Sequence, residues 1–384
     1  MTQPQPSRPP PHGPNHTGWT ATAARSAGWM LALMISIQAV YAVYLCSALQ
    51  TAGLELRFLQ IAAGRTFGEV PPYAALLATV QFFAGSTLES ARGLSVVCML
   101  AVMLLAFDIG RRATGDPVCG AGLALPFVLF PGLAATYSLA TPHALVAMLA
   151  LAIVHDGKCT DDAAVTSARR MSSVLKLTLL ALGIALLHPL GGLVGAAALG
   201  VAGAMSGWTR TRLIRTGLAG AAIVAVAATG ISGTVPNEPD LASLGHNTVA
   251  TAVIMPFAML WVGIVLGGAA LMWSPGVQER LRPGGGRAWA ASAAAAAAML
   301  TAAIGLEFWH PGQALTGMAY LFPLAALGWL PAIVWIRWVM PTIRSFWAWV
   351  LLPVIMYSCF WVVLGPIDPL RFPYGARMSI TGTG

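Results

Sequence analysis

A lone carboxylate, Glu55, follows the first long apolar segment of the chain, and cations lie close behind it. Arg57 and Arg65 come next, and the turn Pro71-Pro72-Tyr73 follows them. A carboxylate can take a proton from a hydroxyl group, and an arginine can stabilise a departing phosphate. These residue types in this order make the stretch a candidate for an active site.

Three more polar residues, Arg92, His143 and His188, lie near the ends of later apolar segments. If those segments cross a membrane, all three reach the same side as Glu55. We therefore expect Glu55, Arg92 and His143 to converge near one membrane surface. A histidine at such a boundary is nevertheless more often a capping residue than a catalyst.

The composition is that of a membrane protein. The chain has 384 residues, of which 57% are hydrophobic and 9% charged, and its mean hydropathy is +0.75. Soluble domains of this size do not reach such values. The net charge of +8 is explained by Lys and Arg in cytoplasmic loops, and without a basic face carrying interleaved aromatic residues we expect no nucleic-acid partner.

The sequence predicts an all-α integral membrane protein with about eleven transmembrane helices. We expect a disordered cytoplasmic tail over residues 1–26, a transmembrane domain over 27–364 with its first outer loop at 50–90, and a short outer tail over 365–384. A juxtamembrane helix is expected at Pro71–Ala84, which is too short to span comfortably. The expected spans are Ala27–Leu49, Leu94–Ile109, Val118–Thr136, His143–Val154, Val174–Leu187, Leu190–Met205, Thr216–Ile231, Thr248–Trp273, Ala288–Gly305, Gly317–Ile336 and Phe346–Leu364.

The basic residues predict the orientation. With the N-terminus inside, five of the 21 Lys and Arg residues fall on the outer side, which leaves sixteen inside. Such a bias obeys the positive-inside rule, and it places the C-terminus outside. We expect the protein in a bacterial inner membrane. The five outer basic residues are Arg57, Arg65, Arg92, Arg371 and Arg377.

Seven short motifs follow one another between about residues 50 and 195. They are Gly53-Leu54-Glu55-Leu56-Arg57, Pro71-Pro72-Tyr73, Phe83-Ala84-Gly85-Ser86, Ala91-Arg92-Gly93-Leu94-Ser95, Gly110-Arg111-Arg112-Ala113-Thr114-Gly115, Tyr137-Ser138-Leu139-Ala140-Thr141-Pro142-His143 and His188-Pro189-Leu190-Gly191. In this order the motifs resemble the GT-C membrane glycosyltransferases, the class that includes protein O-mannosyltransferases and the aminoarabinose transferase of lipid A. The second half of the chain resembles the class only loosely, chiefly around Tyr320.

The resemblance implies a fold and an activity. It implies a polytopic helical bundle that moves a sugar from a polyprenyl-phosphate donor in the bilayer to an acceptor on the outer face. By resemblance, Glu55 is the candidate catalytic acid or base. The candidate substrate-binding residues are Arg57, Arg65, Tyr73, Arg92, His143 and His188.

Three departures from the class pattern bear on activity. Leu54 stands where the class has the first acid of an Asp-Glu pair, and Thr141 and Ala319 stand where it has arginines. A non-catalytic membrane scaffold or assembly subunit with a protein partner is therefore an alternative. A lipid or solute transporter is a third, although such proteins normally carry polar residues deep in their spans and an internal repeat.

The sequence predicts no metal site and no bound cofactor. It carries no zinc, haem or nucleotide motif, and its five cysteines are scattered without a CxxC pair or a disulfide framework. The donor sugar, the acceptor and any need for a divalent metal stay open.

Overall fold

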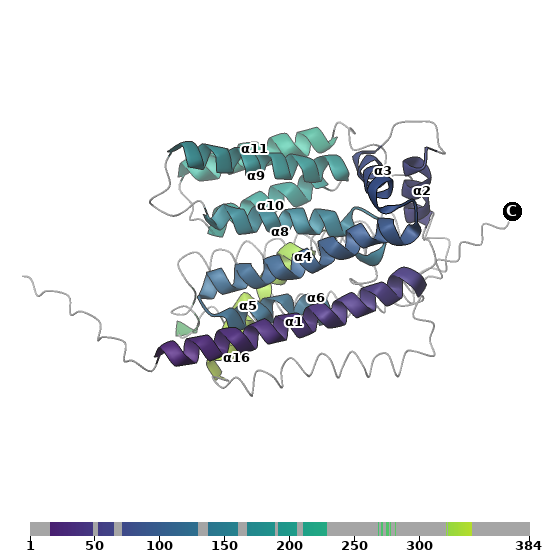
Figure 1. Ribbon diagram of the computed structural model, residues 1–384. Helices are drawn as coiled ribbons and strands as arrows, with labels where there is room; N and C mark the ends of the chain where they lie inside the picture. The colour runs from purple at the N-terminus through teal and green to yellow at the C-terminus, as the bar shows by residue number, and fades with distance from the viewer. Residues whose placement is uncertain are drawn as a thin grey trace, which may run out of the picture.

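The computed structural model describes residues 16–48, 53–64, 71–129, 137–159, 167–188, 191–205, 210–228 and 322–339, with isolated positions between 268 and 320. Every regular element in these ranges is helical (Figure 1). The helices are α1 (His16–Ala48), α2 (Gly53–Ala62), α3 (Pro72–Ala84), α4 (Leu88–Thr114), α5 (Pro117–Ala124), α6 (Pro126–Leu129), α8 (His143–Cys159), α9 (Ser167–Leu187), α10 (Gly191–Met205), α11 (Arg210–Ala228), the 3₁₀ turn η2 (Leu327–Trp329) and α16 (Leu330–Val339).

The long helices form a layered bundle. α1 packs on α4 and α5, α4 packs on α8, and α8 packs on α10 and α9, with α11 against α10. Figure 1 shows the short helices α2 and α3 together at one end, beside the start of α4. We call this the Glu55 end. α4 ends at the opposite side of the bundle, which we call the Arg111 end.

Three segments are long and apolar enough, by length and composition, to cross a membrane: Ala23–Tyr44, Leu88–Thr114 and Phe322–Val339. Shorter apolar helices accompany them, among them His143–Gly157 and Gly191–Gly203. The described residues are therefore all-α, as expected, and are compatible with a membrane protein. The spans expected at Thr248–Trp273, Ala288–Gly305 and Phe346–Leu364 lie outside the described residues.

Several helices depart from the expected boundaries, and two of these departures have a local physical cause. α1 begins at His16, inside the stretch 1–26 that was expected to be a disordered tail. Its first turns contain Ala and Thr before the apolar run begins, and a helix already nucleated by that run extends at little cost. The span expected at Val118–Thr136 is divided into α5 and α6 by Pro126, because proline lacks the N–H that would continue the helix.

The ends of α4 are defined by local capping. The Thr87 side chain accepts a hydrogen bond from the backbone N–H of Ser90 at 3.1 Å, which begins the helix. Gly115 ends it in the left-handed region, with φ 80° and its N–H donating to the Arg111 carbonyl. The Gly-Arg-Arg-Ala-Thr-Gly motif is therefore a helix C-terminus, with Arg111 and Arg112 in the last turn, where cations favour the helix dipole.

α3 is buried at its start and exposes apolar side chains at its end. Proline at the first helical position suits its start, and Tyr73, Ala74 and Leu77 are buried. The Tyr73 ring meets Phe58 of α2 edge-on, with ring centroids 5.1 Å apart. At the far end, Phe82 and Phe83 are more than four-fifths exposed. The helix is therefore apolar on its exposed side as well as on its buried side, and its length matches the short helix expected at Pro71–Ala84.

Candidate functional site

Glu55 and Arg92 form a buried ion pair at the Glu55 end. The Arg92 Nε donates to Glu55 Oε1 at 2.8 Å, and Nη2 donates to Oε2 at 2.7 Å. Both side chains have no exposed surface. This two-point contact is the strongest arrangement available to an arginine and a carboxylate. The predicted convergence of these two residues is confirmed.

Backbone groups complete the pair. The N–H of Ala140 donates to Glu55 Oε1 at 2.7 Å, and Arg92 Nη1 donates to the carbonyl of Cys46 at 2.6 Å. Glu55 comes from α2, Arg92 from α4, Cys46 from α1, and Ala140 from the segment before α8. One ion pair therefore ties four separate segments together.

A second polar group continues from the same turn. Thr141 Oγ1 and His143 Nδ1 are 2.8 Å apart. The His143 ring stacks on Tyr320, with centroids 4.3 Å apart, and His188 lies at the same centroid distance from Tyr320. All four side chains are buried. The rings join the start of α8, the end of α9 and the C-terminal half of the chain.

Burial controls the charge of His188. The residue follows the last turn of α9, and burial lowers the pKa of its imidazole to about 3. His188 is therefore neutral near pH 7. The two rings and Tyr320 then form an uncharged aromatic cluster, in keeping with the structural role that histidines at such positions often have.

The structure brings five of the seven predicted site residues to one end of the molecule. Tyr73 lies in a small hydrophobic cluster with Ala91 and Ala140, the immediate neighbours of Arg92 and Thr141. Arg57 lies within α2, but its side chain is outside the described residues, and so is Arg65. The gathered residues are Glu55, Tyr73, Arg92, His143 and His188.

The sequence did not predict the backbone groups that bind Glu55 and Arg92, or the contact between Thr141 and His143. A carbonyl or an N–H has no side-chain signature, so the roles of Cys46 and Ala140 could not be read from residue types. Thr141 was noted only as a missing arginine, yet its hydroxyl orients His143. Tyr320 was part of a loose motif, and the order Ala319-Tyr320-Leu321-Phe322-Pro323 was the available signal.

The geometry restricts what Glu55 can do chemically. A general base must come within about 3 Å of the hydroxyl whose proton it takes. The Glu55 carboxylate already accepts three hydrogen bonds and has no exposed surface. The hydroxyl of Tyr73 and Nε2 of His143 are buried nearby and have no hydrogen-bond partner among the described residues.

Within the described ranges, no group of three or more His, Cys, Asp or Glu side chains is arranged to hold a metal ion. No family model matches the chain. No curated protein and no solved structure matches it either. The resemblance to GT-C glycosyltransferases thus stands on the sequence motifs.

Proposed function

We propose that this protein is a non-catalytic, multi-pass membrane scaffold or assembly subunit with a GT-C-like bundle. The observation that carries the proposal is the closed Glu55–Arg92 pair, whose two side chains are fully buried against each other. A carboxylate held in this way fastens α2 to α4, whereas a reaction centre needs a carboxylate that an acceptor can touch. The polar residues absent at Leu54, Thr141 and Ala319 support the same function.

In this proposal the bundle of about eleven spans has its N-terminus in the cytoplasm and the Glu55 end outside. The Glu55 end then acts as a rigid outer platform, because the ion pair and the aromatic cluster lock the ends of five helices. A protein partner in the membrane is the expected ligand of that platform. Membrane lipids cover the remaining apolar surface.

A second candidate is a glycosyltransferase that uses a polyprenyl-phosphate sugar as donor. Two observations favour it. Five residues selected from the motifs gather at one end of the molecule, and His143 Nε2 is buried there with no hydrogen-bond partner among the described residues. In that case Arg92 would have to release Glu55 and turn to the donor phosphate during the reaction. Such a rearrangement breaks a two-point contact in a closed site, which is costly.

One experiment separates the two functions. The purified full-length protein is reconstituted in vesicles with mannosyl or glucosyl polyprenyl phosphate and with hydroxyl acceptors for the sugar, namely serine and threonine peptides and lipid A. Released polyprenyl phosphate is measured by mass spectrometry. We expect no release above that of protein-free vesicles. Release that Glu55→Gln abolishes without loss of folded protein, and that the matched variant Glu89→Gln retains, would overturn the proposal. Glu89 suits the comparison because it is an exposed carboxylate in the first turn of α4.

The scaffold function has a positive test of its own. Cross-linking in native membranes, followed by mass spectrometry, should identify a membrane protein joined repeatedly to residues of the Glu55 end. If the protein instead cross-links to many membrane proteins in proportion to their abundance, with no preferred partner, the assembly role is contradicted.

A further inference from the structure

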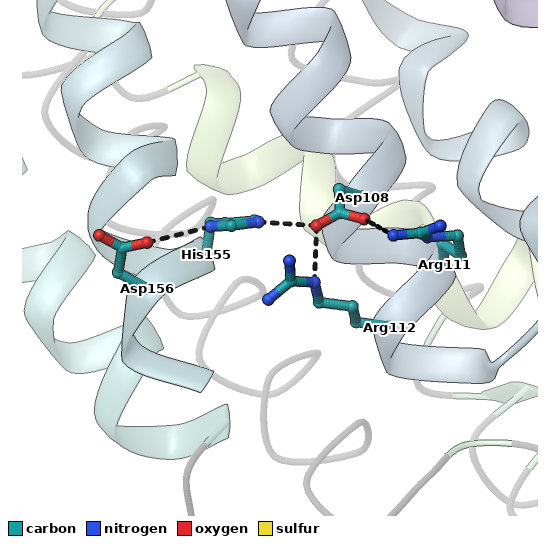
Figure 2. Close-up of polar contacts among 5 residues, drawn as sticks. All are labelled: Asp108, Arg111, Arg112, His155 and Asp156. Carbon is teal, nitrogen blue, oxygen red and sulfur yellow. Dashed lines mark hydrogen bonds and ion pairs between the residues drawn. The ribbon is translucent and has the colours of Figure 1, made fainter. Parts of the chain in front are cut away.

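A second ionic cluster lies at the Arg111 end, far from the residues discussed above. Asp108 of α4 accepts hydrogen bonds from two arginines of the same helix, Arg111 at 2.5 Å and Arg112 at 2.6 Å (Figure 2). The cluster also crosses to α8, because His155 Nε2 lies 2.7 Å from Asp108 Oδ2.

His155 bridges two carboxylates. Its Nε2 contacts Asp108, and its Nδ1 lies 3.1 Å from Asp156 Oδ1 (Figure 2). The imidazole therefore links the carboxylate of Asp108 on α4 to that of Asp156 on α8. Lys176 of α9 also contacts Asp156, which extends the cluster to a third helix.

The cluster carries more positive than negative charge. Two arginines and one lysine stand against the two carboxylates of Asp108 and Asp156. This excess of positive charge attracts anions to the surface around it.

The cations of the cluster face outward and the carboxylates inward. The side chains of Arg111, Arg112 and Lys176 are 51%, 36% and 62% exposed, whereas those of Asp108 and Asp156 are 18% and 27% exposed. A guanidinium has five N–H donors. The single contact between Arg111 Nη2 and Asp108 therefore leaves donors for a second anion.

We propose that Arg111 and Arg112 form a binding site for a phosphate group. Both side chains come from the last turn of α4, and both are held in place by the more buried carboxylate of Asp108. Because α4 is long and apolar enough to span, its last turn lies at the depth where lipid headgroups begin. Anionic headgroups attract each nearby Lys or Arg by about 1 kcal/mol. A phospholipid headgroup and a soluble phosphate share the chemistry that this site recognises.

The test uses the full-length protein in nanodiscs that contain equal amounts of phosphatidylglycerol and phosphatidylcholine. Native mass spectrometry after release counts the lipids that remain bound. We expect selective retention of phosphatidylglycerol, and we expect Arg111→Gln to weaken it about fivefold. Arg112→Gln is a second variant with the same expected direction. Both arginine side chains are partly exposed, so neither change should prevent folding.

The matched control is Arg25→Gln. Arg25 is an exposed cation near the start of α1, and Figure 1 shows that start at the same end of the bundle as the last turn of α4. An equal loss of lipid in Arg25→Gln and Arg111→Gln, or no preference for phosphatidylglycerol, would overturn the proposal. Millimolar inorganic phosphate distinguishes the two sources: displacement of the lipid assigns the site to soluble phosphate, and no displacement assigns it to headgroups.

Discussion

Breaking the Glu55–Arg92 pair from one side should cost far more stability than removing it altogether. In Glu55→Met, Arg92 loses both contacts with the carboxylate, at 2.8 and 2.7 Å, and keeps the carbonyl of Cys46. Its charge stays at a site with no exposed surface. A buried charge left without its partner costs about 3–5 kcal/mol.

The double variant Glu55→Met/Arg92→Met removes the charge as well as the pair. Replacement of a buried ion pair by apolar side chains of similar volume is often neutral or stabilising, by about 1–4 kcal/mol. We therefore expect the double variant to be more stable than either single one. The coupling energy of this double-mutant cycle should be about 3 kcal/mol or more, well above that of an exposed pair.

The assay is unfolding of the detergent-purified protein, followed by tryptophan fluorescence and by the fraction that stays monodisperse. Arg111→Gln is the matched control, because it breaks an exposed pair within one helix and should change stability by less than about 1 kcal/mol. A Glu55→Met protein as stable as the wild type would refute the reasoning, since it would mean that Arg92 finds water or another anion. A double variant less stable than both single variants would refute it too.

Two further predictions concern α10 and His188. A Cβ added at Gly191 would lie 2.0 Å from the Ile184 carbonyl oxygen, so Gly191→Ala should lower the unfolding temperature markedly. Gly200→Ala in the same helix meets nothing within 4 Å and should be neutral or slightly stabilising, as thermal unfolding will show. Burial lowers the pKa of His188 in the folded protein from the ordinary value of 6.5 to about 3. The stability that its neutral imidazole contributes is therefore fully present above pH 6.5 and is lost as the pH falls toward 3. Between pH 6.5 and 5 the wild type should lose about 2 kcal/mol more than His188→Gln, measured as the difference between their unfolding free energies.

The sequence was sufficient for the all-α class and for the gathering of candidate residues at one end of the molecule. Apolar runs and basic residues act over whole segments, so errors of a few residues at Ala27 or Ile109 do little harm. The break at Pro126 could have been expected from proline itself. The helical start at His16 could not, because that polar stretch takes its helicity from the apolar run that follows.

The groups that the candidate residues contact could not be predicted from the sequence. Glu55 and Arg92 are far apart in the chain, and their charges and positions suited a donor phosphate as well as each other. The choice between these is made by packing: α3 and the turn before α8 close over the pair, and Tyr73, Ala91 and Ala140 leave it no exposed surface. Which anion an arginine meets depends on such closure, and closure has no signature in a single sequence.

The two ends of α4 use arginine for different purposes, and the difference can be tested on one helix. At the Glu55 end, one arginine and one carboxylate match in number, geometry and burial, so Arg92 is satisfied by the protein itself. At the Arg111 end, two arginines share Asp108 and remain partly exposed, so the protein satisfies them only in part. Arg92→Gln should therefore reduce the folded fraction at unchanged lipid content per folded molecule. Arg111→Gln should lower the bound phosphatidylglycerol at an unchanged folded fraction. If both variants alter the same quantity, the two ends are one coupled network, and the separation of a structural pair from a ligand site is wrong.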